Sequence, residues 1–133
     1  MGTKILVIED SASNRLLLRD ILEAKGYLVI EAPDGKAGFE LAKKELPALI
    51  LLDIQMPVID GFETCRLLRA EQSTARIKIL GVTSYAMKGD REKVLSAGFD
   101  GYISKPLDTR KLPETVAALL AGRRVFTADK GEL

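Results

Sequence analysis

The sequence contains no histidine and no tryptophan, and it has a single cysteine, Cys65. Without histidine, the chain has neither Ser-His nor Cys-His catalysis, and it cannot carry a phosphohistidine. One cysteine cannot form an internal disulfide, and the usual zinc-ligand sets are missing. We therefore expect a protein of the reducing cytoplasm, in which any phosphate chemistry depends on another residue type.

An excess of charge of one sign is also lacking. Lys and Arg number 20 and Asp and Glu number 19, so the net charge is +1 and gives no bias toward nucleic acid. The opening "MGTKILVIED" turns acidic after a short apolar run, unlike a signal peptide or a membrane span. We expect a soluble protein that binds neither nucleic acid nor membranes.

Short apolar segments alternate with helical patterns along the chain. The apolar segments, typical of buried strands, cover residues 4–9, 27–32, 48–53, 77–83 and 101–105. The helical patterns cover residues 13–26, 35–45, 61–72, 88–98 and 112–122. This alternation predicts an α/β fold: a doubly wound, five-stranded parallel sheet with helices on both faces.

The first helical pattern is the clearest. Ser11 or Ser13 is its predicted N-cap, and Gly26 lies just past its end. Its expected apolar face consists of Leu17, Leu18, Ile21 and Leu22.

The 133 residues fit one domain with a sizeable core. We predict that this domain covers residues 1–121. Residues 122–133 lack clear periodicity and are expected to form a short, loose C-terminal tail, with no output domain.

Polar residues stand where the predicted strands end. In doubly wound sheets, ligands bind beyond the carboxyl ends of the strands, so these side chains should face one crevice. They are Glu9 and Asp10 after the first strand, Asp53 after the third, Thr83 after the fourth and Lys105 after the fifth.

The three acidic residues would repel one another unless a hard cation lay between them, and Mg²⁺ is the natural candidate. An aspartate can act as a nucleophile and form an aspartyl phosphate when cations neutralise the transferring group. We predict that Asp53 is the nucleophile, that Lys105 is the nearby cation, and that the Thr83 hydroxyl reaches a phosphoryl oxygen. Each residue also has a purely structural interpretation, but their joint placement favours the functional one.

The motifs "VIED", "LLDIQMPVIDG", "GVTS" and "YISKP" resemble those of the response-regulator receiver domain of bacterial two-component signalling, from residue 3 to about residue 121. The resemblance implies a flavodoxin-like receiver fold with strand order 2-1-3-4-5. It also implies that Asp53 accepts phosphate from a phosphohistidine on a histidine kinase or histidine phosphotransfer protein. Mg²⁺ would then be held by Glu9, Asp10, Asp53 and the backbone carbonyl of Gln55.

The resemblance further implies a signalling switch. Thr83 and Tyr102 would move together on phosphorylation and reshape the face formed by the fourth helix, fifth strand and fifth helix, where an unknown downstream protein target binds. We expect a monomer or a phosphorylation-dependent dimer. The fourth helix should dock weakly, because Val94 and Leu95 are its main large apolar anchors.

Other features bear on individual behaviour. "SYAMKGD" and "GYISKPLD" are similar to single-domain regulators of bacterial cell division and to receivers attached to diguanylate cyclases. The resemblance places Gln55 and Tyr85 beside the path of an attacking water, where they would tune dephosphorylation, and the bulk of Tyr85 predicts slow loss of phosphate. Gly81 departs from the apolar residue usual in the fourth strand.

We therefore expect a phosphoacceptor switch that catalyses only its own phosphorylation and dephosphorylation, not a turnover enzyme. A haloacid-dehalogenase-like phosphatase is an alternative, although neither Asp10 nor Asp53 begins the Asp-x-Asp pattern of that family. A receiver acting only by protein contact is a second alternative. A flavin-binding domain of the same fold would need a phosphate-binding loop that the sequence does not show. The pattern is equally that of a receiver cut from a longer hybrid kinase.

Overall fold

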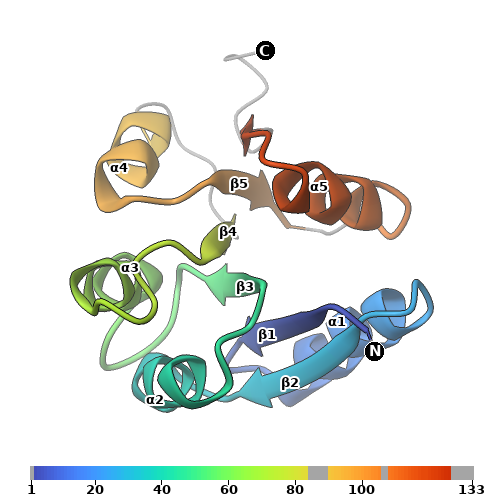
Figure 1. Cartoon of the computed structure of the whole chain (residues 1–133), viewed down its shortest axis with the longest axis horizontal. Coiled ribbons are helices and arrows are strands. Elements are labelled where there is room, and N and C mark those ends of the chain that lie inside the picture. The colour runs from blue at the N-terminus through green and yellow to red at the C-terminus, as the bar shows by residue number, and fades with distance from the viewer. Residues whose placement is uncertain (1, 84–89, 106–107, 127–133) are drawn as a thin grey trace.

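The computed structural model describes residues 2–83, 90–105 and 108–126. Its sheet is parallel throughout and has the order β2-β1-β3-β4-β5-β6 (Figure 1). The first five strands are β1 (Lys4–Ile8), β2 (Leu28–Ala32), β3 (Leu49–Asp53), β4 (Lys78–Thr83) and β5 (Gly101–Ser104). The predicted strand order is confirmed.

Helices cover both faces of the sheet. They are α1 (Ala12–Glu23), α2 (Gly35–Glu45), α3 (Gly61–Ala70), α4 (Asp90–Ala97) and α5 (Lys111–Leu120). Helices α1 and α5 pack on one face, and α2, α3 and α4 pack on the other (Figure 1). The predicted doubly wound fold is therefore confirmed.

Strand β3 lies inside the sheet between β1 and β4 and is buried along its whole length. Ile50 and Leu52 pack toward α2, α3 and α4, whereas Leu49 and Leu51 pack toward α1 and α5. A strand covered on both faces is apolar without alternation, which explains the run before Asp53. Burying such side chains contributes roughly 1.5–3 kcal/mol each, so the strand that ends in Asp53 is firmly held.

The last strand, β6 (Val125–Phe126), pairs with the outer edge of β5. After α5, Gly122 adopts a φ of 93°, which turns the chain back toward the sheet. Val125 then lies opposite Gly101 of β5, and a Cβ added to Gly101 would be only 3.0 Å from the Val125 carbonyl oxygen. The expectation of a loose tail from residue 122 is therefore wrong for Val125 and Phe126. They can pair with β5 because Gly101 has no side chain that would clash with them.

Two helices bury less than expected. In α1, Ser11 is the N-cap, and the helix buries Leu18 and Leu22. Leu17 is 44% exposed and does not belong to the buried face, because it lies about 100° around the helix from Leu18. In α4, Val94 is fully buried, but Leu95 is 37% exposed and is not an anchor.

Packing explains why a glycine, Gly81, stands in the middle of β4. A Cβ at this position would lie 2.9 Å from the Phe99 ring and 3.1 Å from Ile54. The absent side chain therefore leaves room for Phe99, which is itself buried. The rings of Phe99 and Phe62 meet edge to face, with their centroids 6.1 Å apart.

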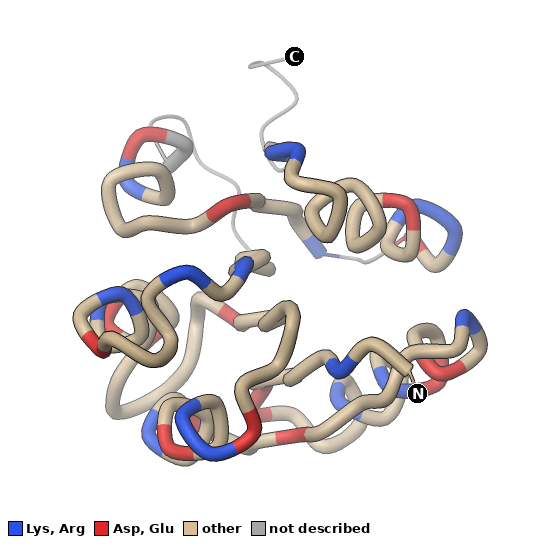
Figure 2. The backbone as a smooth tube through the Cα atoms, in the orientation of Figure 1, with Lys and Arg blue, Asp and Glu red and all other residues tan. Residues whose placement is uncertain are grey.

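Charge is mixed over the surface. Basic and acidic residues are interspersed on α1, α2 and α3, and neither sign gathers on one of these helices (Figure 2). Among the described residues, no helix combines the length and the apolar character needed to cross a bilayer.

Candidate functional site

The carboxyl ends of β1 and β3 bring the predicted acidic residues together. Ile8 and Leu52 are partners in the register of these neighbouring strands, so Glu9 and Asp53 leave the sheet side by side. One carboxylate oxygen from each of Glu9, Asp10 and Asp53 lies within 4.8 Å of the others. Glu9 and Asp53 are only 2% and 3% exposed, whereas Asp10 is exposed. The cluster therefore has a buried floor and an open side.

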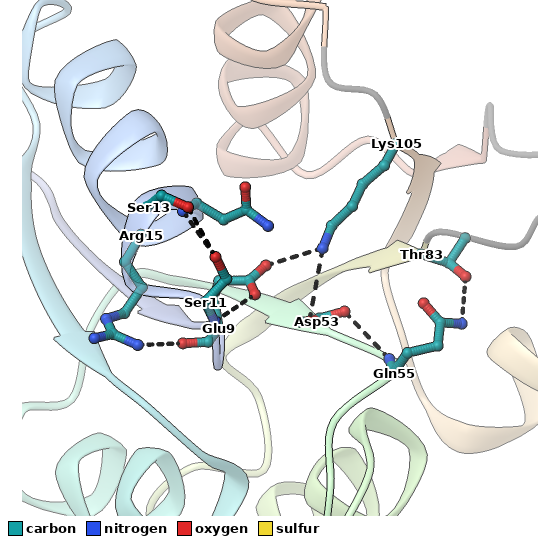
Figure 3. A network of polar contacts seen from close by, with 9 residues as sticks. Glu9, Ser11, Ser13, Arg15, Asp53, Gln55, Thr83 and Lys105 are labelled. Carbon is teal, nitrogen blue, oxygen red and sulfur yellow. Dashed lines mark hydrogen bonds and ion pairs between the residues drawn. The ribbon is translucent and has the colours of Figure 1, made fainter.

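The turn into α1 fixes Glu9. The backbone N–H of Ser11, the helix N-cap, donates to Glu9 Oε2 at 3.0 Å. Arg15 Nη1, one turn along α1, donates to the Glu9 backbone carbonyl at 2.7 Å (Figure 3). The Arg15 guanidinium also forms an ion pair with Glu31, with Nε 3.3 Å from Oε1. Both the side chain and the backbone of Glu9 are thus held from the same helix.

The start of α3 approaches the end of β3 closely. The N–H of Gly61 donates to the Ile54 carbonyl at 2.9 Å, and Asp60 caps the helix by accepting from the Glu63 N–H at 2.9 Å. A Cβ on Gly61 would lie 2.6 Å from the Asp53 carbonyl oxygen. The "DG" of the sequence therefore lets α3 begin directly against the strand that carries Asp53.

Lys105 supplies positive charge inside the cluster. Its Nζ donates to Glu9 Oε1 at 3.1 Å and lies 3.7 Å from Asp53 Oδ2 (Figure 3). Its backbone N–H donates to the Thr83 carbonyl at 2.7 Å, which ties the end of β5 to the end of β4. One lysine ammonium therefore faces two buried carboxylates.

Burial and, after it, the negative charge of Glu9 raise the pKa of Asp53 from 3.8 to about 7, and the positive charge of Lys105 offsets part of this rise. The charged form of Asp53 is thus costly in the metal-free protein. A divalent cation among the three carboxylates would favour the ionised form.

Gln55 joins Asp53 to Thr83. Its backbone N–H donates to Asp53 Oδ1 at 3.2 Å, and its side-chain Nε2 donates to Thr83 Oγ1 at 2.6 Å (Figure 3). Thr83, at the end of β4, is fully buried. The side-chain bond of Gln55 was not foreseen, because the direction of an exposed glutamine side chain leaves no periodic signal in a sequence.

Known proteins of similar sequence match almost the whole chain. The family model of the response regulator receiver domain matches residues 5–117. The chain belongs to this receiver family. It is 37% identical over 120 residues to the polar-differentiation response regulator DivK of Brucella ovis, an alignment that covers 90% of this chain and 98% of that protein.

Solved structures of other receivers show the same fold. The receiver domain of a sensor histidine kinase from Pseudomonas aeruginosa, solved with a magnesium ion coordinated in its active site cleft, is 31% identical with a TM-score of 0.84. That match covers 92% of this chain and 100% of the other. A LuxR-family response regulator from Aurantimonas is 28% identical with a TM-score of 0.89, covering 99% and 94% of the two chains. The resemblance inferred from the motifs is confirmed.

The acidic cluster of this receiver has the donor set of a hard-metal site. Its three carboxylates offer oxygen ligands only, which suit Mg²⁺, and Asp10 lies on the open side. The buried pair Glu9 and Asp53 carries more negative charge than Lys105 neutralises. The residues therefore fit a divalent cation.

Tyr102, one of the two predicted switch residues, belongs to the core and not to the acidic cluster. Tyr102 is 2% exposed and belongs to the core cluster that also contains Phe99 and, from α4, Val94 and Ala97. It therefore connects β5, the strand before Lys105, to the buried side of α4. Tyr85, the predicted modulator of dephosphorylation, lies outside the described residues.

Proposed function

We propose that Asp53 accepts a phosphoryl group from a phosphohistidine on a histidine kinase or a histidine phosphotransfer protein, in a Mg²⁺-dependent reaction. The observation that carries this proposal is a buried Asp53 carboxylate grouped with Glu9 and Asp10 and 3.7 Å from the Lys105 ammonium. Glu9, Asp10, Asp53 and the Gln55 carbonyl would hold the Mg²⁺.

The chemistry is a transfer between two nucleophiles. An Asp53 carboxylate oxygen forms a bond to phosphorus as the bond from phosphorus to the donor imidazole nitrogen breaks, and the imidazole leaves with that electron pair. Bound Mg²⁺ supplies charge neutralisation to the phosphoryl oxygens and favours the ionised form of Asp53. Lys105, which Glu9 orients at 3.1 Å, supplies further positive charge beside Asp53.

The switch would run from Thr83 to α4. Thr83 donates to the new phosphoryl group, and Tyr102 responds because it packs in the same buried cluster as Val94 and Ala97. Since Leu95 is 37% exposed and Val94 is the one large apolar side chain of α4 that is buried among the described residues, α4 can be repositioned at low cost. We propose that a downstream protein reads this change on the face formed by α4, β5 and α5.

The relative DivK is named for polar differentiation, which supports a role for this chain in bacterial cell polarity or division. We propose that the chain acts in the cytoplasm, as a monomer or as a dimer that forms on phosphorylation, with residues 1–121 as its receiver unit.

The lifetime of the phosphoryl group would set how long such a signal lasts. We propose that Gln55 and Tyr85 set this lifetime by hindering the attacking water, so Tyr85→Ala should lose phosphate faster than the wild type. Equal decay rates of the phosphorylated proteins would contradict the role of Tyr85.

The test is the intact mass of the protein after incubation with acetyl phosphate, with and without Mg²⁺, for the wild type and Asp53→Asn. We expect one phosphoryl adduct that requires both Mg²⁺ and Asp53. Steady release of inorganic phosphate with no adduct would favour the phosphatase alternative. If a panel of phosphorylated histidine kinases also yielded no adduct, the chain would act only by protein contact.

A further inference from the structure

The peptide bond between Glu9 and Asp10 joins two of the three acidic residues of the candidate metal site. A peptide group is planar, so the direction of the Glu9 carbonyl also fixes the direction in which the chain continues to Asp10. Arg15 Nη1 donates to this carbonyl oxygen at 2.7 Å (Figure 3). One hydrogen bond from α1 therefore bears on the placement of both carboxylates.

Arg15 is itself held by a residue of β2. Its Nε lies 3.3 Å from Oε1 of Glu31, and both side chains are partly buried. The other oxygen of Glu31, Oε2, pairs with Arg19 Nη1 at 2.8 Å, and Arg19 Nη2 donates to the Val29 carbonyl at 3.1 Å. The Glu31 carboxylate thus lies between two guanidinium groups of α1 and restricts the side chain of Arg15.

We propose that Arg15 is a positioning residue for the metal site and that Glu31 orients it: the guanidinium holds the Glu9–Asp10 peptide so that the carboxylates on either side of it meet one divalent cation. This inference rests on the proposed function and deepens it, because it extends the Mg²⁺ site beyond its four proposed ligands. Groups that orient metal ligands affect metal affinity without binding the metal themselves.

Charge alone predicts the opposite effect for Arg15. A guanidinium beside an acidic cluster repels an incoming cation, so its removal would strengthen Mg²⁺ binding if Arg15 acted only through its charge. If Arg15 acts by position, its removal frees the Glu9–Asp10 peptide and weakens Mg²⁺ binding. Because the Glu31 carboxylate offsets the charge of Arg15, the positional effect should dominate. The sign of the change in affinity therefore distinguishes the two roles.

The experiment measures the dissociation constant of Mg²⁺ at pH 8 from the backbone amide shifts of ¹⁵N-labelled protein. Arg15→Met should weaken binding roughly tenfold, as expected when a group that orients a metal ligand is lost. Arg15→Lys keeps the charge and a donor, so its affinity should be intermediate. Glu31→Gln should weaken binding up to about fivefold, as for a partly exposed ion pair, but less than about twofold in the Arg15→Met background.

Arg66→Met is the matched control, because Arg66 is an exposed arginine of α3 that pairs with Glu63 at 3.5 Å, and it should leave Mg²⁺ binding unchanged. Urea denaturation of each variant shows that folded proteins are compared. Mg²⁺ binding by Arg15→Met as tight as in the wild type, or tighter, would overturn the inference, as would equal effects of Glu31→Gln in both backgrounds. If the wild type bound Mg²⁺ no better than Asp53→Asn, the proposed function itself would fail, which is a distinguishable result.

Discussion

Replacing Asp53 with asparagine should stabilise the metal-free protein at pH 8. The pKa of Asp53 is raised from 3.8 to about 7 because the group is buried and lies beside Glu9. A carboxyl whose pKa is higher in the folded state contributes stability at low pH and loses it as pH rises toward about 7. Asparagine has the shape of the protonated acid and stays neutral, so it avoids this loss.

The magnitude follows from the two pKa values. Their separation corresponds to about 4 kcal/mol once Asp53 is fully ionised in both states, at about 1.36 kcal/mol per pKa unit. At pH 5 part of this cost is already present, because the unfolded carboxyl is ionised there. The stability advantage of Asp53→Asn should therefore grow by roughly 2–3 kcal/mol between pH 5 and pH 8.

The assay is urea denaturation in EDTA, followed by far-UV circular dichroism because the chain has no tryptophan. Asp20→Asn is the control, since it removes the same formal charge from an exposed position on α1. Adding Mg²⁺ at pH 8 should stabilise the wild type more than Asp53→Asn, because the metal binds the ionised cluster. If Asp53→Asn were no more stable than the wild type at pH 8, or if the gap did not change with pH, the electrostatic reasoning would be refuted.

Three further predictions concern the core and the loops. Gly81→Ala should lower the free energy of unfolding by about 1–3 kcal/mol, because the added methyl group overpacks against Phe99. Adding Phe99→Leu to this variant should restore part of the lost stability. A urea midpoint of Gly81→Ala equal to that of the wild type would contradict the overpacking. Burial raises the pKa of Cys65 to about 12, which lowers the fraction of reactive thiolate. Iodoacetamide should therefore alkylate the folded protein roughly a thousandfold more slowly than the urea-unfolded chain. Equal rates would contradict the burial of this thiol. Val58 is exposed with a φ of 69°, so Val58→Asn should raise stability by about 1 kcal/mol in the same denaturation assay, and a lower midpoint would contradict the strain.

The fold could be predicted because its strands are buried on both faces. The runs that end at Asp53 and Thr83 are apolar without alternation, and glycines mark several helix ends, so each element type was evident. In a doubly wound sheet the carboxyl ends of the strands meet at one edge, which places the acidic residues together there. Strand β6 escaped prediction because two residues carry no periodicity, and its place depends on contacts with Gly101 that are distant in sequence.

Side-chain contacts were predictable only where topology forces them. Glu9 and Asp53 lie close together because β1 and β3 are neighbours, and the long side chain of Lys105 reaches them from the end of β5, beyond β4. The Gln55 to Thr83 bond depends on side-chain torsions at two strand ends, which no sequence pattern specifies. The same holds for Leu17, whose exposure depends on how α1 is rotated against the sheet.

The most direct measurement locates the phosphoryl group itself. Borohydride reduces an aspartyl phosphate to homoserine, which tandem mass spectrometry can assign to one position in the chain. After incubation with Mg²⁺ and acetyl phosphate, we predict homoserine at position 53 and at no other aspartate, and none when Mg²⁺ is removed. Homoserine at Asp10 or Asp60 instead, or at Asp53 without Mg²⁺, would contradict the account of a metal-dependent phosphoacceptor at the end of β3.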